Sequence, residues 1–109
     1  MEKWMVLISL SGLPIMDGKN TVSNWDSKVG YLASTDPVVI TEFGDTSGNC
    51  TTLSTFDQNL INWAEPKGIS WTAWAWYPKD CTFPSLITDC NRTANAGGTV
   101  IRQGLQKNP

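Results

Sequence analysis

An uninterrupted apolar run, Val38-Val39-Ile40, constrains the fold of this chain more than any other feature. Three consecutive β-branched residues favour a strand. A strand without polar alternation is typical of a parallel sheet that is buried on both faces. The sequence therefore predicts an α/β protein with a parallel strand at residues 37–44.

Helical spacing is found before this strand. Trp25, Val29 and Leu32 recur at helical intervals, and Ser23 or Asn24 is the expected N-cap. This helix should end before the strand, because the residue that precedes a proline is disfavoured in a helix.

Helical and extended patterns continue to alternate after the strand. The second helix is expected to begin after an N-cap at Ser54 and to stop at Pro66-Lys67-Gly68. A long loop at 77–95 is expected before the last helix. The order of elements is that of βα units. The expected elements are a helix at 25–33, a strand at 37–44, a helix at 55–65, a strand at 69–76 and a helix at 100–107.

The N-terminal residues form a separate part of the pattern. An apolar run from Trp4 to Leu10 follows Lys3, as in the core of a short signal peptide, but no small-residue cleavage site follows it. Residues 11–22 have the composition of a loop. We therefore expect an N-terminal segment at 1–19 that does not match the pattern of βα units, and an α/β part at 20–109.

Composition excludes several classes of function. The chain has no histidine, which removes histidine-dependent triads, general bases and metal sites. Eight basic and ten acidic residues give a net charge of −2 without a basic cluster, so nucleic acid is not an expected partner. No apolar stretch is long enough to span a membrane. We expect no cofactor and no metal ion.

Three cysteines, Cys50, Cys81 and Cys90, lie in polar surroundings without the spacing of a zinc site. A Cys81–Cys90 disulfide would close a short loop, and Cys50 could instead pair with either of them or with a segment outside this chain. Disulfides in loops are typical of secreted proteins. The expected location is therefore extracellular.

Glu42 is the first candidate for chemistry. It lies at the carboxyl end of the predicted strand, where functional side chains of parallel α/β proteins gather. In a regular strand Ile40, Glu42 and Gly44 share one face. A carboxylate beside this apolar run is costly to bury. It is either a catalytic group or a glutamate held by an arginine or a backbone amide.

Trp71, Trp74 and Trp76, three of six tryptophans, fall within the second predicted strand. Tryptophans are often simply large core residues, but an indole face also suits the apolar face of a sugar ring. In a regular strand Trp74 and Trp76 share a face opposite Trp71. We expect Trp74 to form the floor of a sugar subsite, Trp76 to serve the rim or the packing, and Trp71 to face the helices.

Two motifs together resemble one enzyme family. The segment from Pro37 to Gly44 is similar to the seventh strand of glycoside hydrolases of family 5, where a Glu-Phe-Gly triplet holds the nucleophile. The segment from Gly68 to Trp76 is similar to the eighth strand, which supplies a substrate-stacking tryptophan. The resemblance implies the C-terminal βα units of a (β/α)8 TIM barrel, with Glu42 as nucleophile and Trp74 as the substrate-stacking residue. Trp76, near the end of the predicted strand, is the second candidate for substrate binding.

The family resemblance also implies a retaining mechanism, in which two carboxylates lie about 5–5.5 Å apart. The family's acid/base glutamate follows an asparagine on the fourth strand, and this sequence has no Asn-Glu pair. Its other glutamates are Glu2 and Glu65. A His-Pro-Tyr-like segment of the family is also altered, because only Pro14 of the three is present.

Three hypotheses follow for function. The first is part of a secreted endo-β-glycanase that acts on β-1,4-glucan and is inactive alone; the motifs do not separate glucan from mannan or xylan. The second is a carbohydrate-binding module, or one that self-associates through exposed strand edges. The third is a small complete enzyme in which Asp45 or Asp80 replaces the missing acid.

Overall fold

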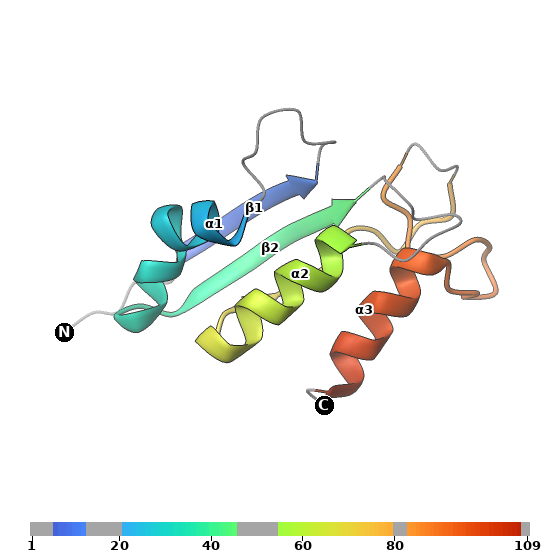
Figure 1. The fold of residues 1–109 in the computed structure, drawn as a ribbon. Coiled ribbons are helices and arrows are strands. Elements are labelled where there is room, and N and C mark those ends of the chain that lie inside the picture. The colour runs from blue at the N-terminus through green and yellow to red at the C-terminus, as the bar shows by residue number, and fades with distance from the viewer. Residues whose placement is uncertain (1–5, 13–20, 46–54, 80–82, 108–109) are drawn as a thin grey trace.

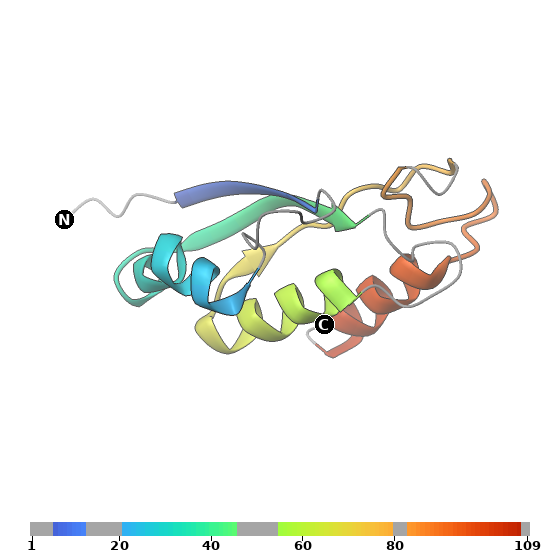
Figure 2. The ribbon, with the colours of Figure 1, turned by 45° about the horizontal axis from the view of Figure 1, so that its top comes forward.

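A computed structural model of the chain describes residues 6–12, 21–45, 55–79 and 83–107 (Figure 1). Three parallel strands form one sheet in the order β1-β2-β3. All three α-helices pack on one face of this sheet (Figure 2). The predicted α/β class with a parallel sheet is confirmed. The elements are β1 (Val6–Gly12), α1 (Val22–Lys28), the 3-10 turn η1 (Gly30–Ser34), β2 (Val38–Asp45), α2 (Thr55–Ala64), the 3-10 turn η2 (Glu65–Lys67), β3 (Ser70–Trp71) and α3 (Ala96–Lys107).

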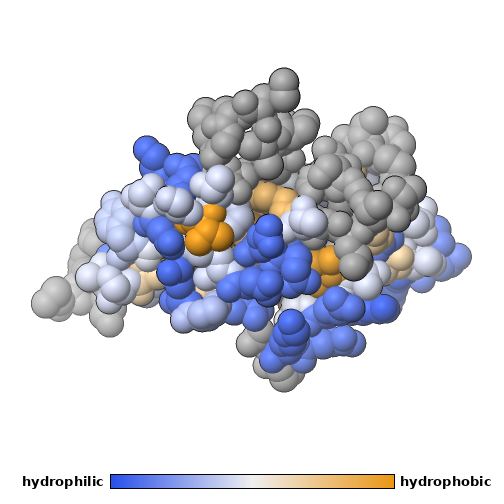
Figure 3. Space-filling model, viewed as in Figure 1, coloured by the Kyte–Doolittle hydropathy of each residue, from blue (hydrophilic) through white to orange (hydrophobic). Residues whose placement is uncertain are grey.

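The core lies between the sheet and the helices. The β2 residues Val38, Ile40 and Phe43 are buried there against apolar side chains of the helices, among them Leu60 and Ile101. Helical spacing correctly predicted the buried face of α2. The helix-bearing side of the molecule is mostly hydrophilic on its outer surface, with scattered apolar residues (Figure 3). This distribution is that of amphipathic helices covering a sheet.

Strand β1 was not expected. It lies inside the segment 1–19 that the sequence pattern set apart, and it pairs in parallel with β2 from Val6↔Val38 to Gly12↔Asp45. The apolar run that we compared with a signal peptide therefore supplies a sheet strand. A short apolar run has no periodicity that separates these interpretations.

The first helix begins earlier and ends earlier than predicted. Its N-cap is Thr21, in an extended conformation, whose hydroxyl oxygen accepts a hydrogen bond of 3.2 Å from the amide of Asn24. Ser23 and Asn24 are therefore helical residues, and the expectation that either caps the helix was wrong. After Lys28 the chain continues as the 3-10 segment η1. The predicted helix at 25–33 is therefore two successive helical segments, the end of α1 and most of η1. The predicted cap Ser54 lies outside the described residues.

The last helix begins at Ala96, four residues before the predicted start at 100. Gly97 and Gly98 concealed this start, because glycine is unfavourable inside helices. At Gly98 a Cβ atom would lie 1.9 Å from the carbonyl oxygen of Leu86, so only glycine allows this close approach. The side chain of Asn95 accepts a hydrogen bond of 2.8 Å from the Gly98 amide and caps the helix.

Among the helices in the described ranges, none is both long and apolar enough to cross a membrane.

Candidate active site

A register shift in β2 determines where Glu42 points. Ile8 of β1 pairs with Ile40, but the next residue of β1, Ser9, pairs with Glu42. Thr41 is therefore an extra residue in β2, which is the arrangement of a β-bulge. As a result Ile40 and Phe43, three residues apart, both face the core, with 0% and 1% exposure, and Glu42 is exposed.

The pairing on the other side of β2 shows the same extra residue. The amide of Thr72 donates to the carbonyl oxygen of Ile40 at 2.9 Å, and the amide of Trp74 donates to that of Phe43 at 2.7 Å. Two residues on this side thus span three in β2. The expectation that Ile40, Glu42 and Gly44 share a face was wrong, because the bulge reverses the alternation after Ile40.

The bulge also shortens the second predicted strand. Only Ser70 and Trp71 form regular ladder pairs with β2, so β3 covers two of the residues predicted at 69–76. Beyond Trp71 the chain follows β2 through single hydrogen bonds. Trp74 is thereby held beside the residue that follows Glu42, at the carboxyl ends of two neighbouring strands.

Trp74 belongs to a group of aromatic side chains that we call the aromatic cluster: Trp74, Tyr77 and Phe83. The ring of Phe83 lies 6.5 Å from that of Trp74 and 6.0 Å from that of Tyr77, centroid to centroid. Trp74 is 45% exposed and Tyr77 is 58% exposed, whereas Phe83 is half-buried. The sequence analysis missed Tyr77 and Phe83, because they lie in a stretch without regular periodicity.

The aromatic cluster is anchored on the strand end that carries Glu42. Pro84, next to Phe83, accepts a hydrogen bond of 2.8 Å from the Ala75 amide. A Cβ atom at Gly44 would lie 2.6 Å from the carbonyl oxygen of Trp74 and 2.8 Å from the Cβ of Pro84. The glycine of the Glu-Phe-Gly triplet therefore lets both segments approach the end of β2.

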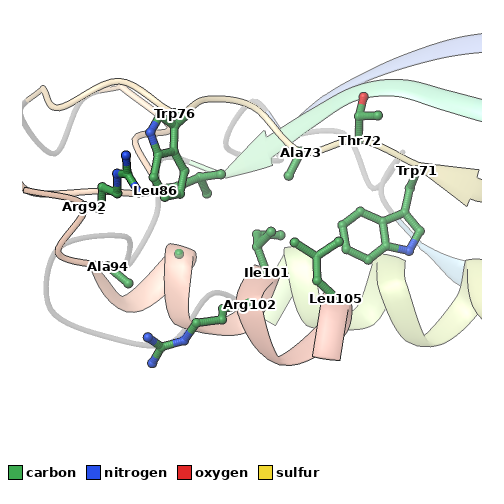
Figure 4. A pocket seen from close by; sticks show the side chains of 11 residues that line it. Trp71, Thr72, Ala73, Trp76, Leu86, Arg92, Ala94, Ile101, Arg102 and Leu105 are labelled. Atoms are coloured by element: carbon green, nitrogen blue, oxygen red, sulfur yellow. The ribbon is translucent and has the colours of Figure 1, made fainter. Parts of the chain in front are cut away.

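Trp71 and Trp76 lie elsewhere. Trp71 packs on the helical layer as predicted, against Phe43 with ring centroids 5.7 Å apart and beside Gly104 of α3. Trp76, 65% exposed, lines the same groove as Trp71, at its opposite end and near Arg92 (Figure 4). The expectation that Trp71 and Trp76 lie on opposite faces was wrong, because the segment after Trp71 is not a regular strand.

This groove, between the 71–76 segment and α3, has a volume of about 430 Å³. Its lining is mainly apolar, and Arg92 and Arg102 are among the residues that line it. Neither Glu42 nor Trp74 lines it. This groove is thus separate from the strand ends that hold the candidate site.

The other glutamates and the two aspartates weighed as acid candidates lie at the opposite end of the sheet or outside the described residues. Glu65 lies in η2, directly before β3, and so at the end of the sheet opposite Glu42. Glu2, Asp80 and the side chain of Asp45 lie outside the described residues. Within the described ranges, no group of three or more His, Cys, Asp and Glu side chains could hold a metal ion. Cys90 is an exposed free thiol, and Cys50 and Cys81 lie outside the described residues.

Comparison with known proteins agrees with this geometry. The family model described as Cellulase (glycosyl hydrolase family 5) matches residues 9–80. A β-glucanase from Saccharophagus degradans, solved in complex with cellotetraose, is 25% identical with a TM-score of 0.62; the match covers 87% of this chain and 30% of that one. The native form of the same enzyme is 23% identical with a TM-score of 0.66, over 93% of this chain and 33% of that one. No curated protein sequence matches.

The fold is thus that of part of a (β/α)8 barrel of the cellulase type. The chain belongs to glycosyl hydrolase family 5, because the family model matches well over half of its residues. It spans about a third of the length of the solved structures that it resembles.

Proposed function

We propose that this chain is the nucleophile-bearing part of a retaining endo-β-glycanase that hydrolyses β-1,4-glucan, with Glu42 as the nucleophile. The observation that carries the proposal is the bulge at Thr41, which turns Glu42 away from the helix-facing core at the carboxyl end of β2. Bulges that re-aim a side chain are frequent next to active sites. Family membership supplies the reaction class.

In this mechanism a carboxylate oxygen of Glu42 attacks the anomeric carbon of the sugar. The bond from that carbon to the glycosidic oxygen breaks, and a second carboxylic acid protonates the departing oxygen. The same acid, now ionised, removes a proton from the water that hydrolyses the glycosyl ester and frees Glu42. The chain itself has no Asn-Glu pair to supply this second group. We therefore propose that it is inactive alone.

The sugar platform of the proposal is the aromatic cluster. Trp74 stacks on a glucose unit next to the scissile bond, because its indole is exposed and its main-chain amide is bonded to the strand end beside Glu42. Trp76 contacts the polymer farther out, at the rim. A β-glucanase with a similar fold was solved with cellotetraose, which supports an oligosaccharide of glucose as ligand. Because β-glucan is an extracellular polymer, we also propose that the parent enzyme is secreted.

A second candidate function is sugar binding without catalysis, with self-association through the open edges of β1 and β3. The exposure of Trp74, Trp76 and Tyr77 together favours it. Single exposed aromatics are ordinary, but several on one segment point to a binding surface. Binding of cellotetraose by a chain that never gains activity in a complete barrel would select this function.

The test uses a chimera in which this chain replaces the matching third of the Saccharophagus degradans β-glucanase. We expect hydrolysis of carboxymethyl-cellulose by the chimera, and its loss in the Glu42→Gln variant with cellotetraose binding retained. Glu65→Gln is the matched control and should keep the activity, since Glu65 lies at the other end of the sheet. Activity of Glu42→Gln within tenfold of the unmodified chimera would exclude Glu42 as nucleophile. A chimera that preferred mannan would contradict the proposal that β-1,4-glucan is the substrate.

A further inference from the structure

The bulge in β2 is held from its β3 side by one hydroxyl group. Thr72 Oγ1 donates a hydrogen bond to the carbonyl oxygen of Thr41, the extra residue. An extra residue has no counterpart in the neighbouring ladder, and a side-chain donor can hydrogen-bond to its carbonyl oxygen. The hydroxyl of Thr72 supplies a donor at this point.

The backbone around Thr72 fits the same arrangement. The amide of Thr72 bonds to Ile40 before the bulge at 2.9 Å, and the amide of Trp74 bonds to Phe43 after it at 2.7 Å. The Thr72 hydroxyl lies between these two contacts. Three donors from residues 72–74 thus reach the carbonyl groups of Ile40, Thr41 and Phe43, one after another.

We propose that Thr72 is a positioning residue for Glu42: its hydroxyl stabilises the bulge that directs the carboxylate out of the helix-facing core. The stabilisation of the bulge by the Thr72 hydroxyl does not depend on the proposed function. Only its consequence for catalysis rests on that function. In a regular strand Glu42 would share the face of Ile40, whose side chain is fully buried. Burying a carboxylate there is strongly unfavourable. Loss of the hydroxyl should therefore open β2 locally at Thr41.

The first test measures amide hydrogen exchange by NMR in the 109-residue chain. Thr72→Val keeps the β-branched shape and removes the donor, and Thr72→Ser restores it. Thr88→Val is the matched control, because the hydroxyl of exposed Thr88 also donates to a backbone carbonyl, that of Thr93 at 3.4 Å, far from the bulge. The amide of Trp74 reports on the bulge, and the amide of Leu60 in α2 reports on global stability.

We expect Trp74 in Thr72→Val to exchange about tenfold faster relative to Leu60, the size of one lost hydrogen bond. Thr72→Ser should return most of this protection, and Thr88→Val should leave the ratio unchanged. A carboxyl ¹³C signal of Glu42 displaced only in Thr72→Val would agree. Equal changes at Trp74 and Leu60, or failure of serine to rescue, would overturn the proposal, because Thr72 would then be one more stabilising residue.

The second test measures catalysis in the chimera. Thr72→Val should lower kcat by about 10²-fold, as expected for a misplaced reacting group, with little change in KM. Thr72→Ser should recover kcat. A kcat unchanged by Thr72→Val would overturn the catalytic consequence. An unmodified chimera without activity would count against the proposed function alone, because the exchange experiment measures the bulge without it.

Discussion

The amide of Trp74 donates a 2.7 Å hydrogen bond to the carbonyl oxygen of Phe43, the residue that follows Glu42. This bond joins the two sequence motifs that indicated a glycoside hydrolase. It fixes the tryptophan at the same edge of the sheet as the carboxylate, although Phe43 and Trp74 lie 31 positions apart in the sequence. The relative position of the proposed nucleophile and the proposed sugar platform is thus set by main-chain pairing, which a substitution of the Trp74 side chain itself leaves in place.

Trp74 can therefore be changed without disturbing Glu42. We expect cellotetraose to quench tryptophan fluorescence of the chain and Trp74→Ala to remove this quenching. Trp76→Ala, the control, should retain most of it, because Trp76 lies in the groove beside α3. Quenching that survives in Trp74→Ala and disappears in Trp76→Ala would move the binding surface to that groove.

Trp71 should behave differently from both. Its ring packs on Phe43 and against Gly104, and it is partly buried. Trp71→Ala should lower the free energy of unfolding by about 3 kcal/mol, the low end for a core tryptophan. Urea denaturation followed by circular dichroism measures this. A loss of sugar binding without a loss of stability would contradict its structural role.

Periodicity predicted those elements whose side chains face a single core. The apolar run Val38-Val39-Ile40 and the spacing of Phe56, Leu60, Ile61 and Trp63 in α2 specify burial directly. All of these side chains are buried except that of Val39, which is only half-buried although the run predicted burial on both faces. The position of Glu42 near a strand end followed from the same pattern. Its face did not, because the bulge depends on a donor from the segment that follows β3, here Thr72. No local pattern in residues 37–44 reveals that contact.

Features that depend on contacts between distant segments could not be predicted from the sequence pattern either. Gly98 has the composition signal of a loop, yet it lies in α3, where the close approach to Leu86 leaves no room for a Cβ atom. Tyr77 and Phe83 gained their significance only from their contacts with each other and with Trp74. These contacts join positions in a stretch where neither the period of a helix nor that of a strand applies.

Because of the close approach at Gly98, a Gly→Ala substitution there should have the opposite effect on stability from the usual one in a helix. Gly→Ala normally stabilises a helix interior by about 1 kcal/mol. At Gly98 the added methyl group would lie 1.9 Å from the Leu86 carbonyl oxygen, so Gly98→Ala should destabilise by about 1–3 kcal/mol. Gly104→Ala should cost less, because its nearest neighbours, at 3.1–3.3 Å, are side-chain atoms of Ile61 and Trp71. Thermal unfolding of the two variants compares them, and a stabilised Gly98→Ala would refute the close contact.

The carboxylate of Asp26 should make the stability of the fold depend on pH. Trp63 Nε1 donates to its carboxylate at 2.8 Å and Lys67 Nζ lies 3.2 Å away, and these partners lower the pKa of Asp26 from its ordinary value of 3.8. A lowered pKa in the folded state contributes stability above pH 3.8 that is lost as the pH falls through the folded value. Asp26→Asn should therefore lower the melting temperature at pH 7 but not at pH 2. Equal effects at both values would exclude the charge as the cause.

The isolated chain should not hydrolyse a glycosidic bond at an enzymatic rate. Retaining hydrolysis needs two carboxylates about 5–5.5 Å apart. The sequence holds three glutamates, Glu2, Glu42 and Glu65. Ser70, the start of β3, pairs with Val39, which lies two ladder steps or roughly 7 Å of strand before Glu42, and Glu65 precedes Ser70. Glu65 therefore cannot reach the reacting atoms that Glu42 would attack.

An aryl-cellobioside assay on the purified chain tests this expectation, with Glu42→Gln as the control for contaminating enzyme. A missing acid/base removes a step that contributes about 10²–10⁴-fold. We expect no turnover that differs between the two proteins. Turnover above about 1 s⁻¹ that vanishes in Glu42→Gln would contradict inactivity alone. It would direct attention to Asp45 and Asp80 as acid candidates, or to a dimer that combines two chains in one site, which sedimentation of the active sample would distinguish.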